Sequence, residues 1–183
     1  MAAALGRPIS AQTKLSGSVE AATGLAYTFG GRFDMREVVD MRVGADVRLG
    51  RPSRPQLVVG LERDWLRINL LPYHVCNGSA PGLVCWQPFP SLDGYSLSLG
   101  AVVSPRKKYE LRAGVGMGTY APVYEPDDVR GYIAHADLTR FGDRGLGLSI
   151  GARVLAFPDY AAGRLTTVVA SVGGRWRTPY SAP

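Results

Sequence analysis

Hydrophobic and polar residues alternate with a period of two along most of the chain, most regularly over residues 95–104 and 109–118. The apolar phase of these two runs consists of Tyr95, Leu97, Leu99, Ala101 and Val103, followed by Tyr109, Leu111, Ala113, Val115 and Met117. The opposite phase holds serine, glycine, glutamate and arginine. Because successive side chains of a strand point to opposite faces, each run predicts a β-strand with one apolar and one polar face.

The same alternation recurs in six further runs, over residues 15–29, 41–50, 57–62, 131–138, 146–154 and 167–176. Strands joined in succession by hairpins form an antiparallel meander, and eight of them can close into a barrel without a free edge. No run has the spacing of an amphipathic helix. We therefore predict an all-β fold, an eight-stranded antiparallel up-and-down β-barrel.

Alternation alone does not say which face points inward. In a soluble lipocalin-like barrel the apolar face would line the interior and bind an apolar ligand, whereas in a transmembrane barrel it faces lipid. The polar phase carries as many acids as bases, namely Glu20, Asp46, Glu62, Glu110 and Asp137 against Arg42, Arg48, Arg112, Arg153 and Arg175. Each enclosed charge needs a partner, so this balance suits a buried network. We predict that these ten residues form an interior charge network in a transmembrane barrel, with the soluble barrel as the alternative.

Two further features favour the membrane. Glycine recurs on the polar phase, which suits a narrow interior, whereas a solvated face would use more lysine than the three residues present. Aromatic residues lie near the ends of the runs, as in the interfacial girdles of membrane barrels: Tyr27, Phe29, Trp65, Tyr95, Tyr109, Tyr132 and Trp176. Side chains just fill the interior of an eight-stranded barrel, so we predict no wide pore.

The third run becomes irregular at Arg63, Asp64 and Trp65. Either a β-bulge interrupts the strand there, or the strand leaves the bilayer. Residues 69–94 are predicted to form the longest loop, which carries Cys76 and Cys85. A disulfide between them would close a short loop in an oxidising compartment, and two free thiols are the alternative. Two cysteines are too few for a structural zinc site, and we predict neither a metal nor a cofactor.

The connections between runs alternate between short and long. The short ones are basic, with Arg51, Arg54, Arg106, Lys107, Lys108, Arg140 and Arg144 against Asp143. The long ones are acidic, with Asp34, Glu37, Asp40, Asp93, Glu125, Asp127, Asp128 and Asp159 against Arg32, Arg36 and Arg164. Short turns on one side and long extracellular loops on the other are typical of bacterial outer-membrane barrels.

Composition excludes other classes. With 46% hydrophobic and 20% charged residues, the chain of 183 residues is not wholly disordered. No stretch reaches the roughly 18 uninterrupted apolar residues of a membrane helix. The net charge of +6 raises nucleic-acid binding as a possibility, but the 18 arginines are scattered and no recognition motif occurs, so we predict no nucleic-acid partner.

One pair of residues hints at catalysis. His135 and Asp137 share a phase of the sixth run, and a lipid-modifying membrane enzyme is therefore an alternative. The favoured interpretation is a structural interior histidine. At the level of domains, we predict a signal-peptide remnant or disordered tail over residues 1–13, a barrel over 14–177 and a tail over 178–183.

Over residues 14–177 the pattern resembles the small eight-stranded outer-membrane β-barrels of the OmpA/OmpX type, by its alternation rather than by a signature motif. The resemblance implies insertion into the lipid bilayer of a bacterial outer membrane by its assembly machinery. It also implies an anchoring, adhesive or envelope-stabilising role. Because His135 and Asp137 should face inward and no serine lies beside them, we predict no enzymatic activity. A surface or envelope protein partner would be contacted through the long loops.

Overall fold

The computed structural model describes residues 14–30, 37–51, 54–69, 75–77, 84–86, 91–106, 108–122, 127–160 and 163–178. The strands are β1 (Lys14–Gly30), β2 (Glu37–Gly50), β3 (Gln56–Asn69), β4 (Val75–Asn77), β5 (Val84–Trp86), β6 (Ser91–Arg106), β7 (Tyr109–Pro122), β8 (Val129–Phe141), β9 (Leu146–Phe157) and β10 (Leu165–Arg177). Within these residues there is no helix, and so none that could cross a bilayer.

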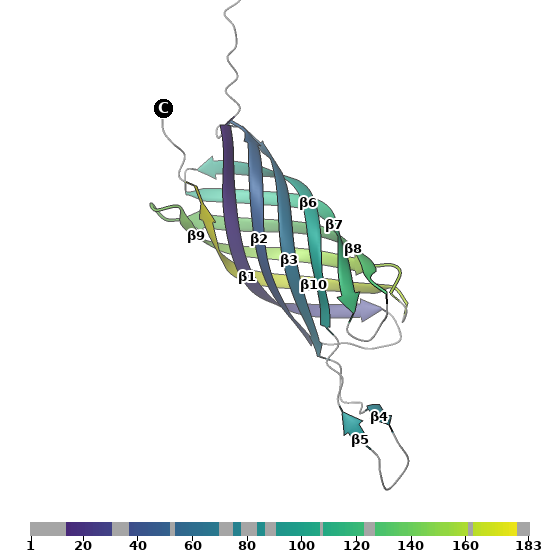
Figure 1. Cartoon of the computed structure of the whole chain (residues 1–183). Coiled ribbons are helices and arrows are strands. Elements are labelled where there is room, and N and C mark those ends of the chain that lie inside the picture. The colour runs from purple at the N-terminus through teal and green to yellow at the C-terminus, as the bar shows by residue number, and fades with distance from the viewer. Residues whose placement is uncertain are drawn as a thin grey trace, which may run out of the picture.

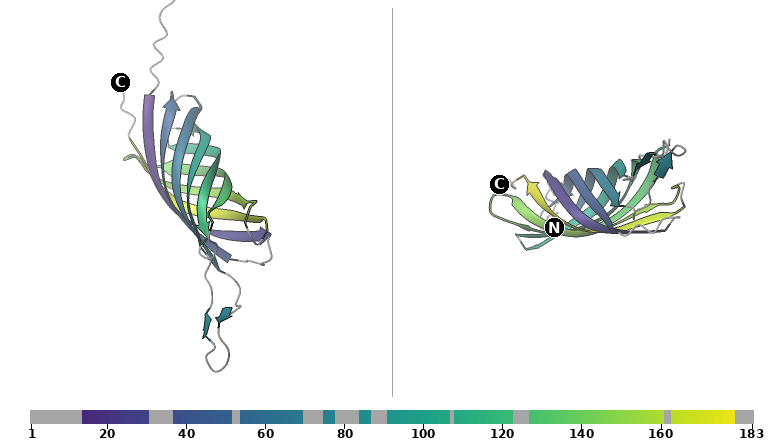
Figure 2. Two further views of the ribbon diagram at one scale, coloured as in Figure 1. Left: turned by 45° about the vertical axis from the view of Figure 1, so that its right-hand side comes forward. Right: turned by 90° about the horizontal axis from the view of Figure 1, so that it is seen from below.

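Eight long strands close into one barrel in the order β1-β10-β9-β8-β7-β6-β3-β2, and all neighbours are antiparallel. The first and last strands seal it, with Leu25 of β1 opposite Ala170 of β10. Strands of the front wall cross those of the back wall, as strand tilt in a closed barrel requires (Figures 1 and 2). The predicted eight-stranded antiparallel barrel is confirmed, and β4 and β5 pair only with each other outside it (Figure 1).

The barrel has two ends with different connections. Residues 31–36, 70–90, 123–128 and 158–164 join strands at what we call the loop end. Residues 51–55, 107–108 and 142–145 join them at the turn end. Both chain ends of the barrel, Lys14 of β1 and Arg177 of β10, belong to the turn end.

The apolar phase points outward on every wall. Leu97, Leu111 and Leu148 are 57%, 49% and 63% exposed, so they do not converge on a common centre. Glu110 and Arg112, which flank Leu111 on β7, are 0% and 4% exposed. The barrel is therefore apolar outside and charged inside, the reverse of a water-soluble barrel.

The irregular stretch of β3 is not a bulge, and the alternative that the strand leaves the bilayer there stays a prediction. Asp64 pairs in regular register with Arg42 of β2 and Gly94 of β6, and β3 continues to Asn69. Asp64 is fully buried, so inward alternation also continues. The pattern looked irregular because an arginine, Arg63, occupies an outward position. The irregularity in the barrel lies instead on β6, where the register with β7 shifts between Val103 and Arg106.

The strands also extend further toward the loop end than the alternating runs did. Three acids expected in long loops belong to strands, Glu37 and Asp40 to β2 and Asp93 to β6. Asp40 is completely buried. Backbone pairing carries a strand past the last apolar residue, so alternation underestimated these lengths.

The interior is not polar throughout, in contrast to the sequence prediction. Toward the loop end it is filled by a cluster of buried apolar residues: Ala26, Leu66, Leu92, Tyr120, Val129, Ile133, Leu155, Phe157, Tyr160, Leu165 and Val169. The rings of Tyr120 and Phe157 meet edge to face, with centroids 5.0 Å apart. Gly131 leaves room for them, because a Cβ there would lie 2.6 Å from the Tyr120 ring and 2.7 Å from that of Phe157. This cluster fills the barrel interior toward the loop end with apolar side chains.

Candidate functional site: a buried charge network and an apolar outer wall

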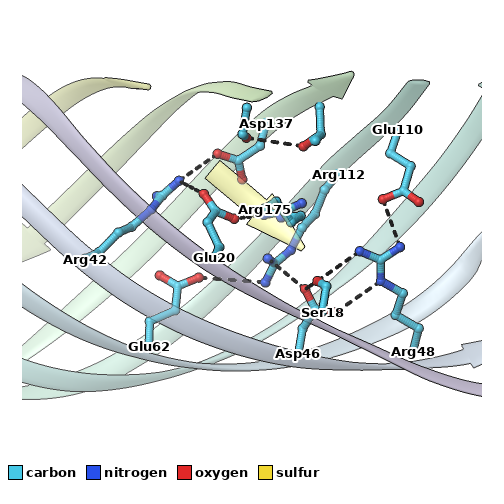
Figure 3. A network of polar contacts seen from close by, with 12 residues as sticks. Ser18, Glu20, Arg42, Asp46, Arg48, Glu62, Glu110, Arg112, Asp137 and Arg175 are labelled. Carbon is cyan, nitrogen blue, oxygen red and sulfur yellow. Dashed lines mark hydrogen bonds and ion pairs between the residues drawn. The ribbon is translucent and has the colours of Figure 1, made fainter. Parts of the chain in front are cut away.

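The structure places all ten residues of the predicted network inside the barrel, and each is less than 9% exposed. Figure 3, which labels all of them except Arg153, shows side chains that extend from several strands toward one another across the interior. Each strand is regular, so these residues alternate with apolar residues that point outward. Every charged residue on the inward face of a strand is therefore buried. The network has three parts, centred on Arg48 at the turn end, Arg42 in the middle and Arg153 nearest the loop end.

Arg48 organises the turn end. Its Nε donates to Asp46 at 3.1 Å, and its two terminal nitrogens donate to Glu110 at 2.8 Å and to Ser18 at 3.0 Å. The Ser18 hydroxyl in turn donates to Asp46 at 2.7 Å. Arg177 forms an ion pair with the other oxygen of Glu110. Arg48 therefore satisfies its guanidinium with charge-assisted bonds to three strands (Figure 3).

Arg42 organises the middle of the barrel. One nitrogen, Nη2, lies 2.8 Å from Glu20 and 2.9 Å from Asp137. The second oxygen of Glu20 pairs with Arg175. These four residues come from β1, β2, β8 and β10, so the group joins strands on both sides of the seam between the first and last strands (Figure 3).

Arg153 organises the part nearest the loop end. Its Nη1 lies 2.7 Å from Asp64 and 3.5 Å from Asp40, and its Nη2 lies 3.0 Å from Glu62. The Tyr120 hydroxyl donates to Asp64 at 2.8 Å, which links the charges to the apolar cluster. Arg153 is thus a fully buried cation that faces three carboxylates.

Arg112 connects the outer parts of the network. It lies 3.7 Å from Glu62 and 3.2 Å from Asp46, so contacts run without a break from Arg153 to Arg48. A gap of about 10 Å³ beside Glu62 and Arg112 is about the size of one water molecule. Apart from this small gap, the charged side chains fill the interior of the barrel around Glu62 and Arg112.

Sequence reasoning missed several members of the network, among them Ser18, Asp40, Asp64, Tyr120 and Arg177. The available signal was phase, because each lies an even number of residues from a recognised inward residue. Asp64 follows Glu62 by two positions, and Asp40 precedes Arg42 by two. With these members the buried carboxylates outnumber the buried arginines, seven to five, and the partly exposed Arg177 adds a sixth cation.

His135 and Asp137 do not form the suspected catalytic pair. Asp137 is bound by Arg42, and neither ring nitrogen of His135 makes a hydrogen bond within the described part of the chain. His135 is 6% exposed and faces the interior, where its Cε1 lies beside Gly114. Among the described residues no group of His, Cys, Asp and Glu is arranged to hold a metal ion.

The outer wall carries exposed leucine, valine, isoleucine and methionine on every strand of the barrel. Its exposed aromatic residues gather near the two ends. Tyr27, Phe29, Tyr95 and Tyr132 lie toward the loop end, and Trp176 lies toward the turn end. This is the distribution expected of a surface that meets hydrocarbon in the middle and lipid headgroups at both edges.

No family model and no curated protein matches the chain. Among solved structures it is similar to Neisserial surface protein A (NspA), with a TM-score of 0.62, 11% identity and coverage of 90% of this chain and 97% of that one. It is also similar to Ail, the attachment invasion locus protein of Yersinia pestis, with a TM-score of 0.50, 10% identity and coverage of 88% and 98%. It is likewise similar to a structure of the Yersinia pestis outer membrane protein Ail in a phospholipid bilayer nanodisc. The TM-score is 0.50, the identity is 12%, and the match covers 90% of this chain and 100% of that one. The chain therefore has the fold of the small eight-stranded outer-membrane β-barrels.

Proposed function

We propose that this protein is an integral β-barrel of a bacterial outer membrane with a structural or surface-interaction role. The observation that carries the proposal is the inverted distribution of side chains, apolar outside and charged inside. Soluble monomers rarely expose a contiguous apolar surface larger than a few hundred Å². In a bilayer the apolar outer wall contacts hydrocarbon, so its exposure to water no longer costs free energy. The fold shared with the outer-membrane barrels supports the same conclusion.

The soluble alternative does not agree with the interior. A barrel that binds an apolar ligand needs an apolar cavity, but the centre of this barrel holds arginine–carboxylate pairs. The same filling supports a barrel without a wide pore, because Arg48, Arg42 and Arg153 cross the interior at successive levels. We expect the reconstituted protein to conduct no current of the size that water-filled porins carry.

The surface-interaction role is assigned to the loop end. The connection over residues 70–90 contains a hairpin of its own, β4 and β5, and loops held on a rigid scaffold commonly carry recognition. On this proposal the loop end is extracellular, and its partner is a surface or envelope protein. We propose no catalytic role, because the one candidate histidine is enclosed within the barrel. Residues 1–13, proposed as a leader remnant or tail, lie outside the described residues.

Resistance to detergent denaturation tests the membrane proposal. The protein refolded into detergent should migrate on a denaturing gel at one position unboiled and at another after boiling, because a closed barrel with all backbone groups paired resists unfolding. Circular dichroism of the unboiled sample should show β-structure. A protein that is folded, monomeric and fully soluble without detergent would contradict the proposal.

A disulfide between Cys76 and Cys85 is proposed for the loop hairpin. The two residues stand directly opposite in the β4–β5 pairing, where Cβ atoms are about 4.5–5.5 Å apart in an antiparallel pair. That is close to disulfide geometry, although the side chains of both cysteines lie outside the described residues. Maleimide should fail to label the denatured, unreduced protein and should label two thiols after reduction. Labelling of both thiols before reduction would contradict the bond, and the double variant Cys76→Ser/Cys85→Ser is the blank.

A further inference from the structure

The apolar outer wall ends abruptly on one side of the barrel, at two neighbouring rows of residues that cross four strands. The lower row is apolar and consists of Leu61, Leu97, Met117 and Tyr132, which are opposite one another in register. The upper row, two residues nearer the loop end, consists of Arg63, Tyr95, Thr119 and Arg130. All eight residues belong to the outward phase of β3, β6, β7 and β8. Two cations, Arg63 and Arg130, therefore lie next to the apolar lower row, on its loop-end side.

A groove of about 360 Å³ lies between the two rows. Its lining includes all of the lower row and, from the upper row, Tyr95, Thr119 and Arg130. Thr119 is small between two larger neighbours, so the wall is lowered at that point. A groove with an apolar floor and a cation at its rim is shaped for a molecule with both an anionic and an apolar part.

The guanidinium of Arg63 stacks on Tyr95, a residue that lines the groove. It lies 4.2 Å from the centroid of the Tyr95 ring on the next strand and 5.4 Å from that of Trp65. Three strand spacings, about 14 Å, separate the backbones of Arg63 and Arg130. Stacking on Tyr95 carries the guanidinium of Arg63 across part of that interval, and a ring contact does not neutralise its charge.

The acids of this region do not neutralise the two arginines. Asp93 lies opposite Trp65, and Asp127 and Asp128 precede Arg130 in the chain. Within the described residues, none of them forms an ion pair with Arg63 or Arg130. Both cations are thus placed at the edge of the apolar wall and are available to an external anion.

We propose that Arg63 and Arg130 bind the phosphate of an anionic membrane lipid whose acyl chain lies in the groove above Leu97 and Met117. Arginine pairs with phosphate through parallel N–H donors, and a cation near an anionic lipid surface strengthens attraction to it. The proposal rests on the membrane function proposed above. It assigns a lipid site to one wall of the barrel, toward the loop end.

Tryptophan quenching tests the site, because Trp65 lies beside Arg63. The probe is a variant with Trp65 as its sole tryptophan, Trp86→Phe/Trp176→Phe, reconstituted in phosphatidylcholine vesicles that contain brominated phosphatidylglycerol or brominated phosphatidylcholine at equal mole fraction. We expect the anionic lipid to quench Trp65 more strongly. The preference should fall by about fivefold for each arginine changed to glutamine, since one cation contributes on the order of 1 kcal/mol.

The matched control is Arg140→Gln, which removes an exposed outward arginine at the turn end of β8. It should leave the preference at Trp65 unchanged. A sole Trp176, in the variant Trp65→Phe/Trp86→Phe, reports the opposite edge of the barrel and should not respond to Arg63→Gln/Arg130→Gln. Heat-modifiable migration of each variant shows that it is folded.

The outcomes separate this inference from the membrane proposal. If neither lipid quenches Trp65 or Trp176, the chain is not in the bilayer and both proposals fail. Equal quenching of Trp65 by the two lipids, or a preference that survives Arg63→Gln/Arg130→Gln, overturns the lipid site alone. If Trp176 is quenched but Trp65 is protected from both lipids, this wall does not contact lipid at Trp65, which also overturns the lipid site.

Discussion

Replacing Arg153 by methionine should lower the free energy of unfolding by about 3–5 kcal/mol, the range seen when one partner of a buried ion pair is removed. Arg153 is fully buried and lies within 3.5 Å of Asp40, Asp64 and Glu62. Methionine fills much of the volume but leaves three carboxylates without their shared cation. Equilibrium unfolding by urea in phospholipid vesicles, followed by circular dichroism, measures the change.

Two variants make this result specific. Arg144→Met removes an exposed arginine from the turn between β8 and β9, and it should change stability by less than about 0.5 kcal/mol. Adding Asp64→Asn to Arg153→Met removes one of the orphaned charges while an amide oxygen can still accept from Tyr120. It should recover at least about 1 kcal/mol, because contacting residues couple by about 0.5–3 kcal/mol. Equal losses for Arg153→Met and Arg144→Met would show that the network does not stabilise the barrel.

Breaking the network is costly even though buried charges need not stabilise a barrel better than apolar residues would. Desolvating an arginine and a carboxylate costs several kcal/mol for each ion, and their attraction only offsets that cost. Chains of shared contacts, such as Arg153 to Glu62 to Arg112, make each charge depend on the others. Replacing a complete set by apolar residues can therefore be tolerated where removing one member is not.

Much of the fold could be predicted from the sequence because a strand has a period of two and a barrel has only two faces. Once Leu97 and Leu99 were placed on one phase, the opposite phase was determined for the whole run. The residues of the network followed in the same way, since every charge in a regular run, such as Arg112, shares the inward phase. Closure followed from the number of strands and from the need to pair every edge.

Partners across the interior could not be predicted from the sequence. Arg48 bonds to Glu110, 62 residues away, and Arg153 to Asp64, 89 residues away, and neither pair belongs to adjacent strands. Such pairs depend on the tilt and stagger of the closed barrel, which period-two alternation does not encode. Residues whose polarity does not match the face they lie on were also missed. Leu92 and Leu155 are inward yet apolar, and Arg63 is outward yet charged.

An outward apolar wall could face water or lipid. Arginine substituted at two positions along one strand, one at its end and one in its middle, distinguishes these two media. Leu146 and Ile150 share the outward phase of β9 and are 62% and 55% exposed. Leu146 begins the strand at the turn end, whereas Ile150 is the third of its five outward apolar residues from Leu146 to Val154. In water both positions should accept arginine with similarly small losses, because each is already more than half exposed.

In a bilayer the two substitutions should differ. Ile150→Arg should lower the free energy of unfolding by about 2–4 kcal/mol, the cost of an arginine near the midplane, and Leu146→Arg by about 0–1 kcal/mol, the cost near an interface. Urea unfolding in vesicles measures both, and the shared strand and phase cancel most of the change in strand propensity. Equal effects at the two depths would mean that the wall does not face lipid. A gradient from Leu146 to Ile150 would show that hydrocarbon surrounds the middle of the barrel, which exposure in an isolated chain cannot establish.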